Sequence, residues 1–253
     1  MIYQHRICLN EGERLPYGTA YRLYAWLLEQ LPEEIAEGLH EQSGVHLSQY
    51  LRYQQEEHKN LWILNVPNDE TERVIVPLLR EQAEIELQNS APLRILSAEQ
   101  KSISPQSLVF SGENEKYTVM EFLTPAAFKQ AGRYAIYPSE QLILQSLTMH
   151  WNELIPELAV TDEDALRSLL QGIHITDYVL HTTRYPLKGT KIPSFVGRIV
   201  LEARLPLPLM QLWNALIGVA AYTGIGMKTA LGMGGTAVRR TAAPFQKSKR
   251  GGD

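Results

Sequence analysis

A glycine-rich stretch near the C-terminus, residues 222–235 (YTGIGMKTALGMGG), has the residue types and spacing best suited to chemistry. It holds five glycines in fourteen positions and one cation, Lys228. Glycine is kept where the backbone adopts positive φ or comes close to another group. Backbone N–H groups beside a lysine favour contact with phosphates. The stretch therefore predicts a loop that binds a phosphate backbone; the alternative is a tight helix–strand connection in which backbone packs on backbone.

Two familiar phosphate-binding loops do not fit this stretch. A P-loop has glycine directly before Lys-Ser/Thr, whereas Met227 precedes Lys228 here. The dinucleotide-binding fingerprint needs a third glycine where this chain has Thr229. It also follows a strand, whereas residues 207–222 have the apolar spacing of a helix. What remains is a Gly-apolar-Gly pattern at 224–226 and again at 232–234.

Charge is divided unevenly along the chain. From residue 171 onward there are eleven Lys and Arg against three Asp and Glu, a net charge of +8, whereas residues 1–170 carry −12. The basic third contains the glycine-rich stretch, and this asymmetry favours a polyanion as partner. The single cysteine, Cys8, excludes a disulfide framework and a cysteine-rich metal site. No apolar run approaches the roughly 20 residues of a membrane-spanning helix, and the N-terminus lacks a signal-peptide pattern, so we expect a cytoplasmic protein.

The elements that position this stretch follow from the periodicity of apolar residues. In the first half we expect strands at 1–9, 61–66, 84–87 and 93–98, and helices at 20–31, 32–39 and 70–79, the last capped by Asp69. This order fits a ferredoxin-like βαββαβ unit in which one strand is hard to place.

The second half predicts a similar unit. We expect a strand at 116–123, a helix from the cap Ser139 to about residue 154, a shorter helix at 162–170, strands at 173–183 and 195–204, the helix from 207, and a last strand at 235–240. The two strands in the middle are joined by residues 185–193, a long hairpin connection carrying Lys188 and Lys191. We expect domains at 1–112 and 113–240 and a disordered basic tail at 241–253. The predicted fold class is α+β.

Several segments resemble one known family. The glycines Gly224, Gly226, Gly232 and Gly234 with Lys228 are similar to the C-terminal signature of the CRISPR-associated repeat-processing endoribonucleases, the Cas6 family of the RAMP superfamily. Residues 122–129 (FLTPAAFK) resemble the family's F-x-T-P-x-x-F strand, 142–152 the helix after it, and 195–199 (FVGRI) its F-x-G strand. The resemblance covers most of the chain and implies two tandem ferredoxin-like domains.

The resemblance also implies metal-independent RNA cleavage. In such chemistry the RNA supplies a 2′-hydroxyl nucleophile, and the protein supplies a general base, a general acid and charge stabilisation. Histidine suits the acid or base role because its ordinary pKa is about 6.5. His40 in the run LHE stands where the family has its histidine; its other interpretation is a partner for a helix C-terminus. His46 lies where some members have lysine, and Tyr24 lies near the catalytic tyrosine of some members, with simple packing as its alternative.

For RNA binding we favour Lys188, Lys191, Arg198 and Lys228 together with Gly224, Gly226, Gly232 and Gly234. Each cation has an ordinary surface position as its alternative. No histidine stands in a metal-binding motif, so we predict neither a metal site nor a cofactor.

The resemblance therefore implies an endoribonuclease that cuts CRISPR precursor RNA within its repeats, leaving a 5′-hydroxyl and a 2′,3′-cyclic or 3′ phosphate. It implies that the protein stays on the guide RNA and joins an effector complex, and it leaves homodimer formation open. Two other interpretations are a catalytically inactive RAMP-type RNA-binding subunit and a nucleotide-binding enzyme.

Overall fold

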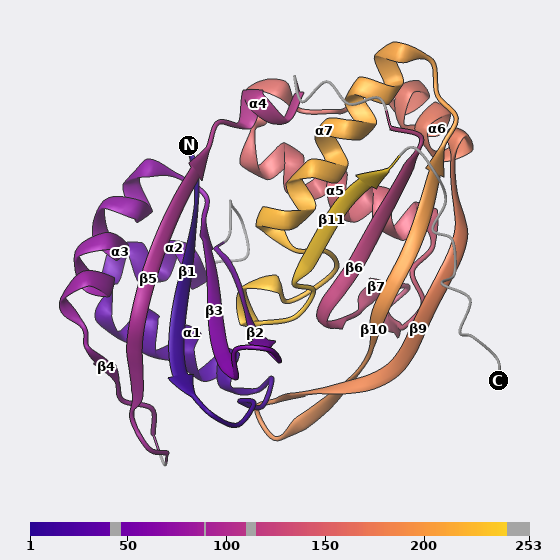
Figure 1. Cartoon of the computed structure of the whole chain (residues 1–253). Helices are drawn as coiled ribbons and strands as arrows, with labels where there is room; N and C mark the ends of the chain where they lie inside the picture. The colour runs from indigo at the N-terminus through magenta and orange to yellow at the C-terminus, as the bar shows by residue number, and fades with distance from the viewer. Residues whose placement is uncertain (41–46, 89, 110–114, 242–253) are drawn as a thin grey trace, which may run out of the picture.

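Two antiparallel sheets, each carrying helices on one face, make up the chain in the computed structural model, which describes residues 1–40, 47–88, 90–109 and 115–241 (Figure 1). The first unit comprises β1 (Ile2–Glu11), α1 (Thr19–Gln30), α2 (Glu33–His40), β2 (Ser48–Gln54), β3 (Lys59–Val66), α3 (Asp69–Glu81), β4 (Glu84–Ile85) and β5 (Leu93–Ile103). Its strand order is β2-β3-β1-β5-β4. Without the short β4, this is the arrangement expected of a ferredoxin-like βαββαβ unit.

The second unit repeats this arrangement. It comprises α4 (Pro105–Val109), β6 (Tyr117–Ala126), β7 (Phe128–Gln130), β8 (Arg133–Ala135), α5 (Glu140–Leu154), η1 (Pro156–Leu158), α6 (Glu163–Gly172), β9 (Ile173–Leu187), β10 (Thr190–Ala203), α7 (Leu207–Thr223), η2 (Thr229–Leu231) and β11 (Thr236–Thr241). Its main sheet has the order β11-β6-β10-β9, and β7 pairs with β8 in a separate hairpin. The predicted fold, two ferredoxin-like domains in tandem, is confirmed.

Most helix starts predicted from sequence are also found, with one correction. Ser139 accepts a hydrogen bond from the Leu142 amide at 3.3 Å, and Asp162 caps α6 in the same way. The cap of α3 is Asn68, whose Oδ1 accepts from the Thr71 amide at 2.9 Å, so the expectation of Asp69 was wrong by one residue.

The hairpin between β9 and β10 also differs from its prediction. The two strands continue to Leu187 and from Thr190, so the turn consists only of Lys188 and Gly189, with φ of 47° and 77°. Two left-handed residues are what a tight two-residue hairpin turn requires. The expected long connection at 185–193 is therefore mostly strand.

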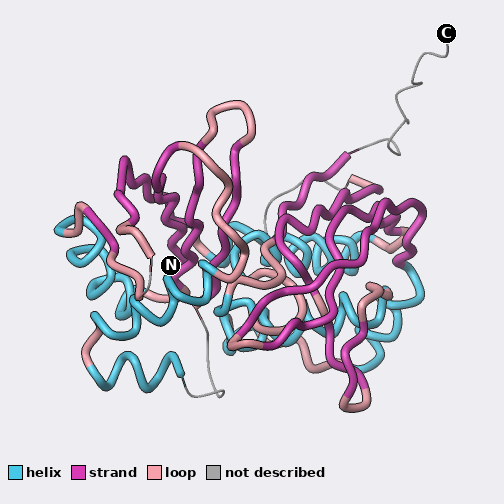
Figure 2. Tube along the Cα trace, turned by 90° about the horizontal axis from the view of Figure 1, so that it is seen from below, coloured by secondary structure: helices cyan, strands magenta, loops and turns pink. Residues whose placement is uncertain are grey.

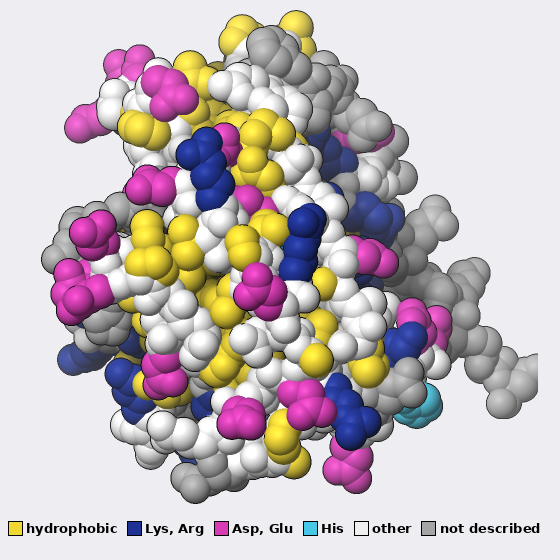
Figure 3. Space-filling view, turned by 90° about the vertical axis from the view of Figure 1, so that its left-hand side faces the viewer, with side chains coloured by type: hydrophobic (Ala, Val, Ile, Leu, Met, Phe, Trp, Pro, Cys, Tyr) yellow, Lys and Arg dark blue, Asp and Glu magenta, His cyan; other side chains and the backbone are white. Residues whose placement is uncertain are grey.

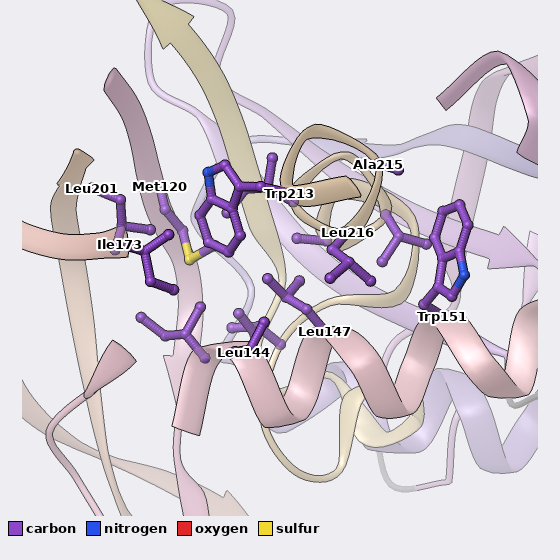
Figure 4. Packing of buried hydrophobic residues seen from close by; sticks show 14 of the residues in the cluster. Met120, Leu144, Leu147, Trp151, Ile173, Leu201, Trp213, Ala215 and Leu216 are labelled. Atoms are coloured by element: carbon purple, nitrogen blue, oxygen red, sulfur yellow. The ribbon is translucent and has the colours of Figure 1, made fainter. Parts of the chain in front are cut away.

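The core of the second domain lies between its sheet and α5 and α7 (Figure 4). Leu147 and Trp151 of α5 pack toward Leu216 of α7, and Trp213 covers Met120 of β6. Trp151 and Trp213 are 2 % and 1 % exposed, and burying side chains of this size supplies a large share of a domain's hydrophobic stabilisation.

The two domains lie side by side with their sheets on one side of the molecule, as the view in Figure 2 shows, where most helices lie below the strands. On the face of the first domain shown in Figure 3, acidic side chains are spread widely, with lysines and arginines among them. None of the helices within the described ranges is long and apolar enough to cross a membrane.

Candidate functional site

The glycine-rich loop that follows α7 fills the space between the two domains. A Cβ on Gly232 would lie 2.4 Å from the Cβ of Ala20 in α1 and 2.6 Å from the hydroxyl of Tyr185 in β9. A Cβ on Gly235 would lie 2.4 Å from the ring of Tyr50 in β2. Since real Cβ atoms do not approach this closely, these positions accept only glycine without movement of a neighbour.

The amides of the four predicted RNA-contacting glycines are already bonded within the protein. The four hydrogen bonds run from Gly224 to Ala220 O at 3.0 Å, from Gly226 to Ser146 Oγ at 2.8 Å, from Gly232 to Thr229 O at 3.4 Å, and from Gly234 to Pro125 O at 3.0 Å. The expectation that bare amides of these glycines face phosphates is therefore wrong. The prediction of an unusual backbone at these glycines is confirmed, because all four have positive φ. The groups that lie close to them are other residues of the protein.

Lys228 differs from its glycine neighbours. Its φ is 59°, a left-handed conformation that is uncommon for a residue with a side chain. Its carbonyl accepts from the Leu231 amide at 3.0 Å and the Met233 amide at 3.3 Å, which holds that conformation in place. Its side chain is half-buried at the surface of the loop. A strained residue held by its surroundings is found more often at functional sites than elsewhere.

Gln49 in β2 connects the loop to the first domain. Its Nε2 donates to Ala20 O in α1 and to Ala230 O in the loop, both at 2.9 Å. Its Oε1 accepts from Trp62 Nε1 at 2.9 Å. The side chain is 1 % exposed, so all of its polar atoms are satisfied by protein.

A second series of hydrogen bonds between polar side chains connects the first domain to the end of α7. Ser48 Oγ donates to Tyr222 O at 2.7 Å and accepts from Asn65 Nδ2 at 2.9 Å. Gln4 Nε2 donates to Asn65 Oδ1 at 2.7 Å and lies 3.4 Å from Ala221 O. The open face of the first sheet is therefore fixed to the helix that leads into the glycine-rich loop. Sequence reasoning missed Ser48 because β2 itself was not predicted, and it missed Gln4 and Asn65 because the sequence of a strand does not show which distant carbonyls its polar side chains reach.

Tyr24 has a structural partner. Its hydroxyl donates to Leu39 O at 3.0 Å, and the residue is 4 % exposed within the core between α1 and α2. Burial raises the pKa of the Tyr24 phenol. The hydrogen bond holds Leu39, the residue before His40, which favours a positioning role for Tyr24. Its catalytic assignment stays a prediction.

His40 is the last residue of α2, and the structure describes its backbone but not its side chain. His46 lies outside the described residues. Both assignments stay predictions. Another histidine, His5, is bound to Glu72 at 2.8 Å with both side chains buried, which gives it a structural partner. Within the described part of the chain, no group of three or more His, Cys, Asp or Glu is arranged to hold a metal ion.

The tip of the β9–β10 hairpin lies against the start of α1. The Lys188 Nζ is 5.4 Å from the centre of the Tyr21 ring, a cation–π distance. Tyr185 of β9 and Met233 of the glycine-rich loop belong to one buried cluster, against which Tyr21 also packs. The structure thus brings the hairpin, the loop and α1 together, with Lys188 and the exposed Lys191 at the surface.

Arg198 lies apart from this group. It is half-buried on β10, opposite Glu121 of β6. Eight residues separate it from Thr190 at the turn, which is about 26 Å along a strand. Arg198 and Lys188 therefore cannot contact the same phosphate.

Comparisons with known proteins agree on one family. A family model described as CRISPR-associated endoribonuclease Cas6 matches residues 120–236. A protein of that name from Streptococcus thermophilus is 30 % identical over 220 residues, covering 85 % of this chain and 89 % of that protein. One from Mycobacterium tuberculosis is 25 % identical over 231 residues, covering 89 % and 73 %.

Solved structures share the fold. A Cas6 product complex superposes with a TM-score of 0.79 at 23 % identity, covering 94 % of this chain and all of that one. A Cas6 of Thermus thermophilus superposes with a TM-score of 0.74 at 21 % identity, covering 94 % and 98 %.

Proposed function

Because the chain belongs to the Cas6 family of CRISPR-associated endoribonucleases, we propose that it cuts CRISPR precursor RNA within each repeat by attack of a 2′-hydroxyl on the adjacent phosphate. The products are a 5′-hydroxyl and a 2′,3′-cyclic or 3′ phosphate. The observation that carries the proposal is the 30 % identity to a Cas6 endoribonuclease along 89 % of that protein's length. The same fold in Cas6 structures supports it.

In this proposal, His40 acts as general acid or base. It is the last residue of α2. A protonated imidazole can also stabilise charge that develops on the phosphate in the transition state. His46 is the second candidate for these roles.

Tyr24 serves this site as a positioning residue. Its hydrogen bond to Leu39 O fixes the backbone that leads directly into His40. The carbonyls of a helix's last turn lack intrahelical partners, so an external donor orders that turn. An ordered backbone restricts the positions that the His40 side chain can take, and so holds it closer to the geometry that cleavage needs.

RNA is held by cations around the junction of the hairpin and the loop. Lys228 and Lys188 extend from segments that the buried cluster with Tyr185 and Met233 holds together. Gly224, Gly226, Gly232 and Gly234 shape this junction by letting the loop fit between the domains rather than through their own amides. Lys191 and, farther along the sheet, Arg198 extend the basic surface.

Further expectations concern the domain boundary, the C-terminal tail, the location and the partners. We place the domain boundary between β5 and β6; residue 112 itself lies outside the described residues, and Leu108 of α4 already belongs to the second core. Of the predicted tail at 241–253, Thr241 is the last residue of β11, and residues 242–253 also lie outside the described residues. The family resemblance further favours a cytoplasmic protein that stays on the guide RNA and joins an effector complex, as a monomer or a homodimer.

Cleavage of a repeat RNA in EDTA by wild type and His40→Ala tests the proposal. We expect wild type to cut without metal and the variant to be about 10²- to 10⁴-fold slower, the usual size of general acid–base help. His174→Ala, which removes an exposed histidine on β9, is the matched control and should cut normally. Mapping the ends of the products checks the cyclic phosphate.

The outcomes separate the alternatives. Equal cleavage by wild type and His40→Ala contradicts the role of His40 but not the activity. Binding of repeat RNA with no cleavage by any variant supports an inactive RAMP-type RNA-binding subunit instead. Cleavage by wild type that stops in EDTA contradicts the metal-free chemistry.

A further inference from the structure

A group of exposed aromatic side chains lies at the outer edge of the second sheet. Tyr134, Tyr137 and Tyr178 are 48 %, 51 % and 54 % exposed. They come from β8, from the segment before α5, and from the edge strand β9. Gathered apolar surface of this kind marks a binding site more often than single exposed residues do. We call these three residues the tyrosine platform.

Tyr134 and Tyr178 lie on strands, and Tyr137 lies in the short segment between β8 and α5. The Tyr137 and Tyr178 rings are 5.9 Å apart between centres, at 85° to one another. Glu140, the first residue of α5, accepts from the Ile175 amide at 2.8 Å and thereby ties the segment before the helix to β9. Since this hydrogen bond and the contact between the two rings hold the two segments together, binding to the rings needs little reordering of the backbone.

Tyr134 belongs to the same corner of the molecule. Only three residues separate it from Tyr137, so their Cα atoms lie within about 11 Å. Lys129 of β7 lies directly opposite Tyr134 in the β7–β8 pairing, and both side chains are exposed. Directly opposed residues on one face of a hairpin are close enough to contact the same ligand.

A further cation follows the platform along β9. Arg184 is exposed and is six residues from Tyr178, so the alternation of a strand puts both side chains on the same face. The rise of a strand makes this separation about 20 Å. Aromatic rings are thus followed by a cation along one edge, in the third of the chain whose net charge is +8.

We propose that the tyrosine platform binds single-stranded RNA outside the cleaved segment, with bases stacked on the rings and phosphates at Lys129 and Arg184. Stacking on exposed aromatic side chains is how proteins hold unpaired nucleotides, and nearby cations follow the backbone. The flanking cations favour RNA over an uncharged protein surface as the occupant. This inference rests on the proposed RNA-processing function and adds a second contact, remote from His40, for unpaired nucleotides that flank the repeat.

Binding of a fluorescein-labelled ten-nucleotide oligoadenylate, followed by polarisation, tests the proposal without cleavage of a repeat. We expect the Tyr137→Ala/Tyr178→Ala variant to bind about 5- to 150-fold more weakly, the range that corresponds to stacking of one base. Tyr178→Phe, which keeps the ring, should bind as wild type does. Leu207→Ala, which removes a 57 % exposed side chain from the start of α7, is the control and should also be unchanged.

Cleavage of a repeat RNA without flanking nucleotides keeps this proposal separate from the function itself. All of these variants should cut it at the wild-type rate, and loss of cutting by wild type would count against the function rather than the platform. Photo-crosslinking of wild type to the decamer carrying 5-iodouridine needs no variant and should label the peptides that contain Tyr137 or Tyr178. Unchanged decamer binding by the double variant overturns the proposal. The proposal is also overturned if light scattering shows that wild type is a dimer and that the double variant is a monomer with unchanged RNA binding. The platform would then join two copies of the chain.

Discussion

Replacing Tyr24 by phenylalanine separates a positioning role from a catalytic one. The substitution keeps the ring and removes the donor to Leu39 O, which lies 3.0 Å away in a region where Tyr24 and Leu39 are 4 % and 8 % exposed. A lost hydrogen bond alone is worth about 0.5–1.5 kcal/mol, and a buried acceptor left without a donor costs about 1–3 kcal/mol. We therefore expect a loss of about 1–2 kcal/mol, which lowers the melting temperature of a chain of this size by about 2–8 °C.

The effect on cleavage should be smaller than that of removing an acid or base. We expect kcat of Tyr24→Phe to fall by less than about tenfold, against the 10²- to 10⁴-fold typical of a lost general acid or base. Burial raises the Tyr24 pKa, so the phenol stays protonated and the pH profile of kcat should keep its shape. Single-turnover rates across pH, with melting curves, measure both. Tyr53→Phe, which removes a hydroxyl bonded to Gly12 O at 2.8 Å in an exposed region, is the control.

A Tyr24→Phe variant that melts like wild type and yet cuts as slowly as His40→Ala contradicts the positioning role. Disappearance of one limb of the pH profile contradicts it as well. Either result makes Tyr24 a catalytic residue that reaches the RNA.

Two further predictions concern the domain junction and acid stability. Gly234→Ala should be destabilised by about 1–3 kcal/mol more than Gly132→Ala in urea unfolding, the usual penalty for overpacking. Both glycines have positive φ, 65° and 77°, but only the Gly234 Cβ would meet a backbone atom, Ile225 O at 2.1 Å, so equal losses would contradict the packing argument. Hydrogen bonds from Lys116 and then Arg204 lower the pKa of Glu202 to about 2. The stability that comes from this lowered pKa is complete above the ordinary value of 4.5 and is lost as the pH falls toward 2. The melting temperature of wild type should therefore fall more steeply with falling pH than that of Glu202→Gln in this range. Parallel curves of melting temperature against pH would contradict the assignment.

The sequence predicts an element well when its signals are local. Ser139 and Asp162 cap α5 and α6 because each side chain binds amides two or three residues away. The cap at Ser139 was predicted, and the helix α6 was predicted to start at residue 162. Gly224, Gly226, Gly232 and Gly234 were also identified correctly as backbone positions with unusual φ.

The strand β2 was missed because the hydrogen-bond partners of its buried polar side chains lie far away in the chain. Ser48 and Gln49 are polar and yet 3 % and 1 % exposed, since they bind carbonyls at Tyr222 and Ala230 of the other domain. A strand whose neighbouring residues are both buried shows no alternation of polar and apolar residues. No pattern within seven residues can report such partners.

The hairpin was misjudged for a different reason. Pro186 and Pro193 made residues 185–193 look like a loop, because proline is rare within sheets. Each stands where β9 and β10 pair with one another, beyond the part of β10 that pairs with β6. In a two-stranded extension the outer side of each strand has no neighbour, so a proline can point its missing N–H away from the ladder.

The loop that identifies the family is therefore explained by the demands of joining two domains. Its Gly-apolar-Gly pairs recur because Ile225 and Met233, both fully buried, alternate with glycines that lie against other backbones or, for Gly232, against the side chains of Ala20 and Tyr185. The Ile225 amide donates to Gly234 O at 2.9 Å, so the two halves of the pattern bind each other. A substitution in this loop should then alter RNA processing by shifting the second domain's cations relative to His40. Lys228 is the member of the pattern that carries a long charged side chain at positive φ, and contact of that side chain with RNA stays our proposal.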